Sequence, residues 1–159
     1  MANINLVRID LRMVHGQVAV KWSSAAKINK IVCVDNQSTE NEILKTIYKM
    51  AAPPGTKVLV YSQEKCVEKW KECQFNDGNV MVLFKDVKSC YETYKAGFPI
   101  STLQLGNAPK NEVKNISLST EFSISEEELT LLKEMANDGV KVEIQSIPEK
   151  PCTPLEKAI

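Results

Sequence analysis

Short apolar runs alternate with longer amphipathic stretches along almost the whole chain. Runs such as Ile31–Val34 are continuously apolar, as in strands that are buried on both faces. Stretches such as Gln63–Cys73 carry apolar residues every three or four positions, which is the spacing of an amphipathic helix. This alternation predicts an α/β fold, with an open, mostly parallel twisted sheet and helices on both faces. Because 159 residues can bury a substantial core, we expect residues 1–159 to form a single domain.

The same pattern predicts the individual elements. We expect strands at Ile4–Ile9, Ile31–Val34, Val58–Tyr61, Val80–Phe84 and Ile100–Leu105, and helices at Gly16–Ala25, Thr39–Ala52, Gln63–Cys73 and from Val87 to a stop at Gly97. Beyond Gly106 the alternation is weaker, and we expect a short strand at Ile116–Leu118, a helix that Ser125 caps and Gly139 ends, and a last strand at Val140–Ile147. Apolar and polar residues alternate in this last strand, so we expect an antiparallel edge strand near the C-terminus.

The basic residues are unevenly distributed. The chain contains two arginines and one histidine, Arg8, Arg12 and His15, within eight consecutive positions, whereas its other basic residues are all lysines. The net charge is zero, which argues against a nucleic-acid-coating surface or an anchor for anionic membranes. In parallel sheets, ligands and catalytic groups gather at the carboxyl ends of the strands. The three rare cations lie at the first such end, where we expect the active loop.

Each residue of this loop has a chemical use. His15 can be a nucleophile because neutral imidazole is available at physiological pH. Asp10 could orient the His15 ring by accepting its second N–H, or could hold the loop. The planar guanidinium of Arg12 suits a phosphoryl group, and Gly16 and Gln17 would present free backbone N–H groups at a helix N-terminus. Phosphoryl transfer needs mostly positioning and charge stabilisation, so these groups could suffice without a metal or cofactor.

Several other classes of protein are disfavoured. The five cysteines are odd in number, form no C-x-x-C pair and suggest structural thiols in a reducing cytosol. A single histidine cannot complete the usual zinc ligand sets. No signal peptide, membrane span or phosphate-binding glycine motif is present, so we expect no direct membrane insertion. A cysteine phosphatase would need Arg six residues after its Cys, but those positions hold Thr39, Glu72, Asn79 and Ala96.

The active loop resembles a known family signature. Arg8-Ile9-Asp10-x-Arg12-x-Val14-His15-Gly16-Gln17-Val18, followed by Trp22, resembles the IIB component of the mannose/fructose/sorbose family of bacterial sugar phosphotransferase systems (PTS). The similarity continues through Ile31–Asp35, Met50–Pro53 with Gly55, Leu83–Lys85, Leu105–Asn107 and Gly139–Val140, and so spans essentially the whole chain. Leu11 departs from the pattern, because the family often has a second acidic residue there, and Asn107–Lys110 also differs.

This resemblance implies a reaction. The histidine that matches His15 accepts a phosphoryl group from a phosphohistidine on the IIA component and passes it to a sugar bound by the membrane components IIC and IID. Arg12 matches the arginine that stabilises the phosphoryl group, and Asp10 matches the loop acid. The implied location is the cytoplasm, at the inner face of the membrane, and the implied substrates are mannose, fructose, sorbose or amino sugars. A regulatory paralogue that keeps the fold without transporting sugar is the alternative.

The remaining candidates each have two interpretations. Asp35 could help hold the His15 loop or begin the next helix, and Arg8 could serve the end of its strand rather than the phosphate. Met13 and Val14 could be core residues, but we favour an exposed docking patch, because a carrier must present its histidine to two partners. Ser62 could donate to phosphate, but we favour a role as the N-cap of the next helix, and Lys85 could steer phosphate, but we favour a solvated side chain. Gly106 and Asn107 are further supporting candidates at a strand end.

Overall fold

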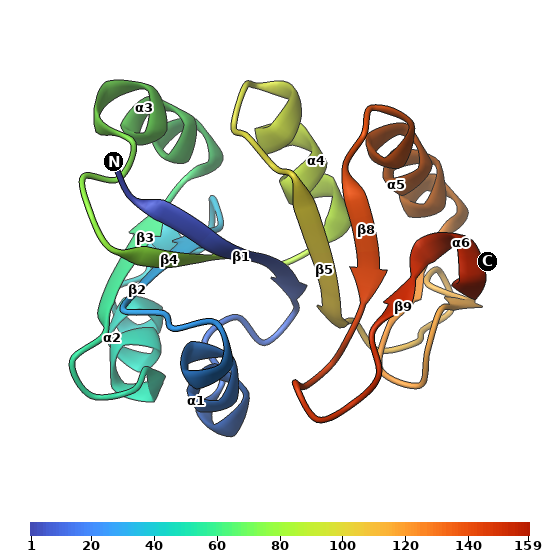
Figure 1. The fold of residues 1–159 in the computed structure, drawn as a ribbon, viewed down its shortest axis with the longest axis horizontal. Helices are drawn as coiled ribbons and strands as arrows, with labels where there is room; N and C mark the ends of the chain where they lie inside the picture. The colour runs from blue at the N-terminus through green and yellow to red at the C-terminus, as the bar shows by residue number, and fades with distance from the viewer.

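The computed structural model describes residues 1–159 and shows a twisted seven-stranded sheet with helices on both faces (Figure 1). The strand order is β3-β2-β4-β1-β5-β8-β9, and every neighbouring pair is parallel except β8 and β9. The predicted α/β class is therefore confirmed. The strands are β1 (Asn3–Asp10), β2 (Lys30–Val34), β3 (Lys57–Tyr61), β4 (Asn79–Phe84), β5 (Thr102–Asn107), β8 (Lys141–Ile144) and β9 (Thr153–Pro154).

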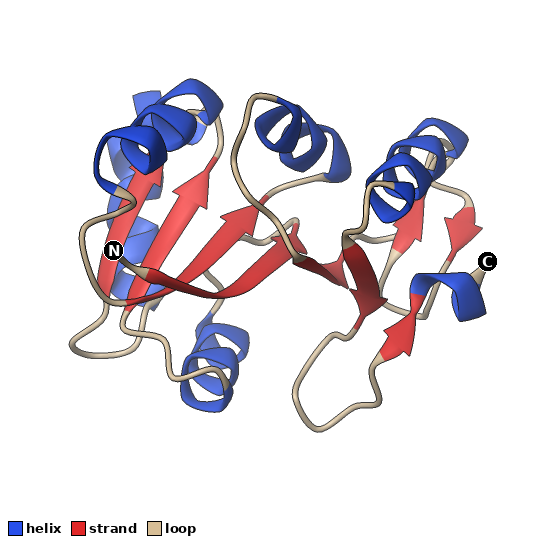
Figure 2. Cartoon of the chain, turned by 45° about the horizontal axis from the view of Figure 1, so that its top comes forward, coloured by secondary structure: helices blue, strands red, loops and turns tan.

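The helices form two layers, with α1 and α2 on one face of the sheet and α3, α4 and α5 on the other (Figures 1 and 2). A short antiparallel pair, β6 (Ile116–Ser117) and β7 (Ser123–Ile124), precedes α5. The helices are α1 (Gly16–Ala25), α2 (Glu42–Ala51), α3 (Gln63–Cys73), α4 (Val87–Lys95), α5 (Glu126–Asn137) and α6 (Leu155–Ala158), with a 3-10 turn, η1, at Ser38–Glu40. None of them is both long enough and apolar enough to cross a membrane.

The two layers explain why the central strands are continuously apolar. Successive residues of a strand point to opposite faces, so both sets are buried when both faces are covered. In β2, Ile31 and Cys33 pack in the smaller core beneath α1 and α2, whereas Val32 and Val34 pack in the larger core beneath α3, α4 and α5. In β4, Met81 and Val82 are divided in the same way.

The C-terminal edge differs in detail from the prediction. An antiparallel edge strand is present, but it is β9 rather than the predicted Val140–Ile147 strand. That segment forms β8, which ends at Ile144 and pairs in parallel with β5. Directly after β8, the carbonyls of Gln145 and Ser146 accept hydrogen bonds from the Arg8 side chain.

The predicted helix at Thr39–Ala52 is also interrupted. η1 ends before Asn41, whose side chain accepts a hydrogen bond from Leu44 N and so begins α2 as a new helix. The apolar residues Ile43, Ile47 and Met50, which share a helical spacing, face solvent, with Met50 80% exposed. The residue that α2 buries is Tyr48, one position along from Ile47.

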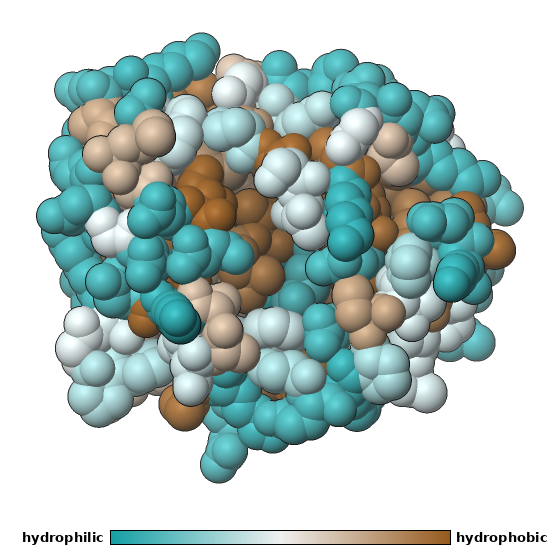
Figure 3. All heavy atoms as spheres, in the orientation of Figure 1, coloured by the Kyte–Doolittle hydropathy of each residue, from teal (hydrophilic) through white to brown (hydrophobic).

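The sheet is held together at its centre by a short ladder. β1 pairs with β4 along Asn3–Ile9, but it pairs with β5 only from Arg8 to Asp10. Before Arg8 the two strands separate around an open cavity of about 600 Å³ lined partly by Ile4–Val7 and Ile100. Figure 3 shows apolar side chains gathered in a hollow near the middle of this face. The β1–β5 contact therefore lies at the carboxyl end of β1, where the active loop begins.

Candidate functional site

The loop between β1 and α1 makes a tight reversal. Met13 N donates to the carbonyl of Asp10 at 3.0 Å, and Met13 has a φ of 59°, in the left-handed region. The helix then begins with His15 as its N-cap, and Ala19 N donates to the His15 carbonyl. His15 is exposed, and its ring makes no capping hydrogen bond. The imidazole is thus open to a partner, beside the first backbone N–H groups of α1, which favour an anion.

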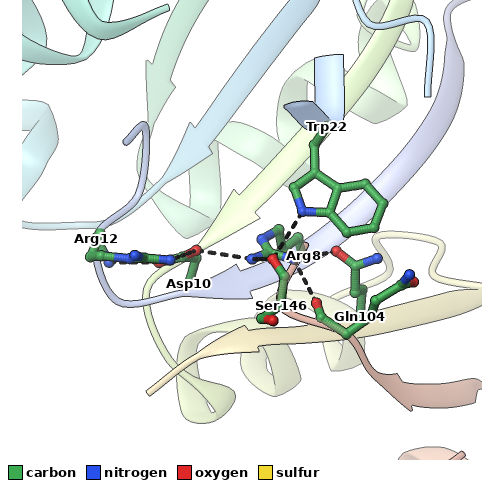
Figure 4. A network of polar contacts seen from close by, with 7 residues as sticks. Arg8, Asp10, Arg12, Trp22, Gln104 and Ser146 are labelled. Carbon is green, nitrogen blue, oxygen red and sulfur yellow. Dashed lines mark hydrogen bonds and ion pairs between the residues drawn. The ribbon is translucent and has the colours of Figure 1, made fainter. Parts of the chain in front are cut away.

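Asp10 is fully buried and anchors the loop. Its Oδ1 accepts from Arg12 Nε at 3.1 Å and from the backbone N of Arg12 at 3.0 Å. Its Oδ2 accepts from Arg12 Nη2 at 3.1 Å and from Arg8 Nη2 at 3.2 Å (Figure 4). None of these bonds reaches His15. Of the two roles expected for Asp10, the structure therefore supports holding the loop rather than orienting the ring.

Arg12 is oriented by Asp10 but remains accessible. Its side chain is 35% exposed, and its Nε and Nη2 groups point at the carboxylate. The outer nitrogen, Nη1, has no partner among the hydrogen bonds of the protein. A guanidinium held in this way can bind phosphoryl oxygens without first losing the entropy of a free side chain.

Arg8 lies at the end of β1 and is 1% exposed. It contacts Asp10, the Gln104 side chain and the carbonyls of Gln145 and Ser146, so it cannot reach a bound phosphate directly. Burial lowers its pKa, and the neighbouring Asp10 opposes that shift. This agrees with the interpretation in which Arg8 serves the end of its strand.

Met13 and Val14 do not form an exposed docking patch, and that prediction is wrong. They are 3% and 4% exposed and belong to the smaller core, with Ala19 and Trp22. The left-handed turn at Met13 folds this part of the loop onto the sheet. The exposed apolar residue of the loop is Leu11, at 40%.

The other strand-end residues mostly hold local structure. Asp35 accepts from the backbone N and the hydroxyl of Ser38 and so begins η1, which supports its helix-initiating role. Ser62 caps α3 by accepting from Lys65 N at 3.0 Å. Lys85 lines a shallow polar hollow together with Asp35 and takes no part in the Asp10 network.

Gly106 and Asn107 contact the active loop through their backbone. The Asn107 carbonyl accepts from Leu11 N at 3.0 Å. Gly106 lies directly against the Arg8 guanidinium. Sequence reasoning missed Gln104, Trp22 and Ser146 as members of the same network. The one signal available was the polar Gln104 between two leucines in a strand that is otherwise buried.

Fold and loop together define a class of protein. A parallel sheet presents an exposed histidine at a strand-to-helix loop, beside an arginine held by a buried carboxylate, and this arrangement suits an α/β phosphocarrier. Residues 4–159 match the family described as PTS system sorbose subfamily IIB component. The chain belongs to this family.

Relatives and solved structures agree with this assignment. The chain is 31% identical over 148 residues to the sorbose-specific EIIB component of Klebsiella pneumoniae, covering 93% of this chain and 90% of that protein. It is 28% identical over 149 residues to the fructose-specific EIIB component of Bacillus subtilis, with the same coverage. The crystal structure of the IIBSor domain of the K. pneumoniae sorbose permease superposes with a TM-score of 0.90 at 29% identity, covering 98% of this chain and 95% of that one. The crystal structure of manxB from Thermoanaerobacter tengcongensis superposes with a TM-score of 0.91 at 34% identity, covering 98% of this chain and 94% of that one.

Membership of the family establishes the activity in outline. The chain is a IIB component of a sugar PTS and hence a phosphotransferase, which works with a IIA donor and a membrane IIC partner.

Proposed function

We propose that His15 is the residue that carries the phosphoryl group. The observation that supports this most directly is its place as the exposed N-cap of α1, three residues after an arginine that Asp10 holds in a fixed orientation. In the first half-reaction, the N–P bond on the IIA phosphohistidine breaks as a ring nitrogen of His15 bonds to phosphorus. The donor imidazole leaves with its electron pair. Arg12 then faces the charge that spreads over the equatorial oxygens.

The second half-reaction reverses these roles. A hydroxyl oxygen of the bound sugar bonds to phosphorus as the N–P bond on His15 breaks. The His15 imidazole keeps the electron pair of that bond and takes up the proton that the hydroxyl loses. The acceptor is a sugar of the mannose, fructose, sorbose or amino-sugar class, held by the membrane components IIC and IID. The protein would accordingly act in the cytoplasm, at the inner face of the membrane. Gly16 and Gln17 contribute backbone N–H groups to the phosphoryl site.

Incubation with phosphorylated IIA tests the assignment of His15. Intact mass measurement should show one phosphoryl group that is labile to acid and stable to base, and His15→Ala should not acquire it. A phosphoryl group that persists in His15→Ala would disprove the assignment. Transfer to sugar in membranes that contain the cognate IIC and IID then separates transport from the regulatory alternative, which predicts phosphorylation without onward transfer.

A further inference from the structure

Arg8 is a buried arginine that lies next to Asp10, beneath the proposed phosphoryl site. Arginine is rarely buried completely, because its charge must then be paired and its N–H groups satisfied. Arg8 Nη1 donates to Gln104 Oε1 at 2.5 Å and to the carbonyl of Gln145 at 2.9 Å. Its Nη2 donates to the carbonyl of Ser146 at 2.7 Å and to Asp10 Oδ2 at 3.2 Å. Only Nε, among the buried nitrogens of this side chain, has no partner.

The surroundings of Arg8 are shaped to hold its guanidinium in one place. A Cβ on Gly106 would lie 2.3 Å from Arg8 Cζ, so only glycine permits this close approach. The ring centroid of Trp22 lies 5.3 Å from Arg8 Cζ, within the range of a cation–π contact. Trp22 Nε1 also donates to the Ser146 carbonyl at 3.1 Å, so β1, α1 and the segment after β8 meet at one point (Figure 4).

The net charge of the cluster formed by Arg8, Asp10 and Arg12 bears on phosphoryl binding. Asp10 and Arg12 alone would form a neutral pair, in which the carboxylate cancels the charge that a phosphoryl group needs. With Arg8 included, two guanidinium groups face one carboxylate, and the cluster carries a net charge of +1. The accessible part of that charge is on Arg12, because Arg8 is buried and Arg12 is not.

We propose that Arg8 is a positioning residue for phosphoryl transfer. It fixes Asp10, which in turn orients Arg12, and it offsets the Asp10 charge so that Arg12 presents a positive charge to the phosphoryl group on His15. This inference rests on the proposed function of His15. It adds a residue that touches neither the substrate nor the reacting nitrogen.

A double-mutant cycle of Arg8→Met and Asp10→Asn tests this role, with the rate of phosphoryl transfer from phosphorylated IIA as readout. Arg8→Met should slow transfer by roughly tenfold to a hundredfold, because Asp10 then neutralises Arg12. Arg8→Met/Asp10→Asn should be no slower than Asp10→Asn alone, because the carboxylate whose charge Arg8 offsets is gone. Arg8→Lys should lie between wild type and Arg8→Met. If Arg8 has a merely structural role that is independent of the Asp10 charge, the losses of the two single variants multiply in the double variant, and that result would overturn the proposal.

A second comparison applies if Arg8→Met alone does not fold. The double variant removes both buried charges, that of Arg8 and that of Asp10, which is better tolerated than removing one of the two. In the Asp10→Asn background, Arg8→Met should change the transfer rate by less than about threefold, since no carboxylate remains to offset. A further tenfold loss of the transfer rate in that background would contradict the charge-offsetting role.

If wild-type protein acquires no phosphoryl group on His15, the proposed function itself is wrong. If it does but Arg8 and Asp10 show no coupling, only this inference is wrong.

Discussion

Arg12 and Asp10 face each other through two parallel contacts, Nε to Oδ1 and Nη2 to Oδ2, each 3.1 Å long. The carboxylate is completely buried, whereas the guanidinium is about one-third exposed. Such a bidentate pair defines both the position and the plane of the arginine. Arg12 is therefore held by a buried group of the protein interior, although its own side chain is partly exposed at the surface.

Arg12 should be sensitive even to conservative substitution. Lysine keeps the charge but cannot make two parallel contacts with Asp10, so Arg12→Lys should transfer phosphoryl groups more slowly than wild type. In Arg12→Ala the rate of phosphoryl transfer should fall by about a hundredfold or more, because this change removes the charge as well. Rates are measured by rapid quench with phosphorylated IIA. Lys45→Ala on α2, which removes an exposed ion pair, provides the control and should match wild type. An Arg12→Ala rate equal to wild type would contradict the role of Arg12.

Gly106→Ala should be destabilising for a steric reason. The new methyl group would overlap the Arg8 guanidinium, whose Cζ, Nη2 and Nε atoms lie from 2.3 to 2.6 Å away. Hydrogen bonds from Nη1 and Nη2 to backbone carbonyls hold this guanidinium in place. We expect a loss of about 1–3 kcal/mol in the free energy of unfolding, measured with urea.

A matched glycine separates this overlap from backbone strain. Gly55 has a φ of 81°, and a Cβ added there would meet nothing within 4 Å, so Gly55→Ala should cost only about 1 kcal/mol. The double variant Gly106→Ala/Arg8→Met should lose less free energy of unfolding than the two single variants together, because the Arg8 guanidinium that the new methyl group overlaps is removed. Full additivity would show that Arg8 is not the obstacle.

Substitutions on the two faces of α2 should differ greatly in their effect on the free energy of unfolding. Tyr48 is 6% exposed, and its hydroxyl lies 3.3 Å from Ser38 Oγ, so Tyr48→Ala should lower the free energy of unfolding by about 3–5 kcal/mol. Ile47 is 49% exposed, and Ile47→Lys should change that free energy by no more than about 0.5 kcal/mol. Equal losses in the two variants, measured by chemical denaturation, would contradict the observed orientation of the helix.

Apolar spacing predicted most of the sheet but not this orientation. Continuous apolar runs mark β2 and β4 because helices cover both of their faces. In α2, by contrast, the spacing of apolar residues does not indicate the buried face. Ile43, Ile47 and Met50 share a helical spacing typical of core residues, but they are exposed to solvent. The order of β8 and β9 also could not be predicted, because β9 is two residues long and contains a proline.

The exposed part of the candidate site was predictable, whereas its buried part was predictable only for Asp10 and Arg8. His15 and Arg12 are singled out by rarity and by their place after a strand. The burial of Met13 and Val14 depends on a left-handed turn at Met13. Because Met13 is not a glycine, the sequence gives no sign of this turn. The Arg8 network depends on carbonyls of Gln145 and Ser146, which any residue type would supply, so composition carries no trace of it.

Thiol labelling should distinguish the cysteines by burial. Burial raises the pKa of Cys66 to about 12 and raises those of Cys33 and Cys90 as well, so these thiols carry little reactive thiolate near pH 8. Cys73 is half-buried and donates to the Lys69 carbonyl. Cys152 is exposed, and although burial of its thiol and a hydrogen bond with Glu143 raise its pKa, reagent can reach it. A chromogenic disulfide should therefore label one cysteine rapidly in the native protein and all five in denaturant. Cys152→Ser should abolish the rapid phase, and a rapid phase that persists in this variant would show that one of the inner thiols is accessible.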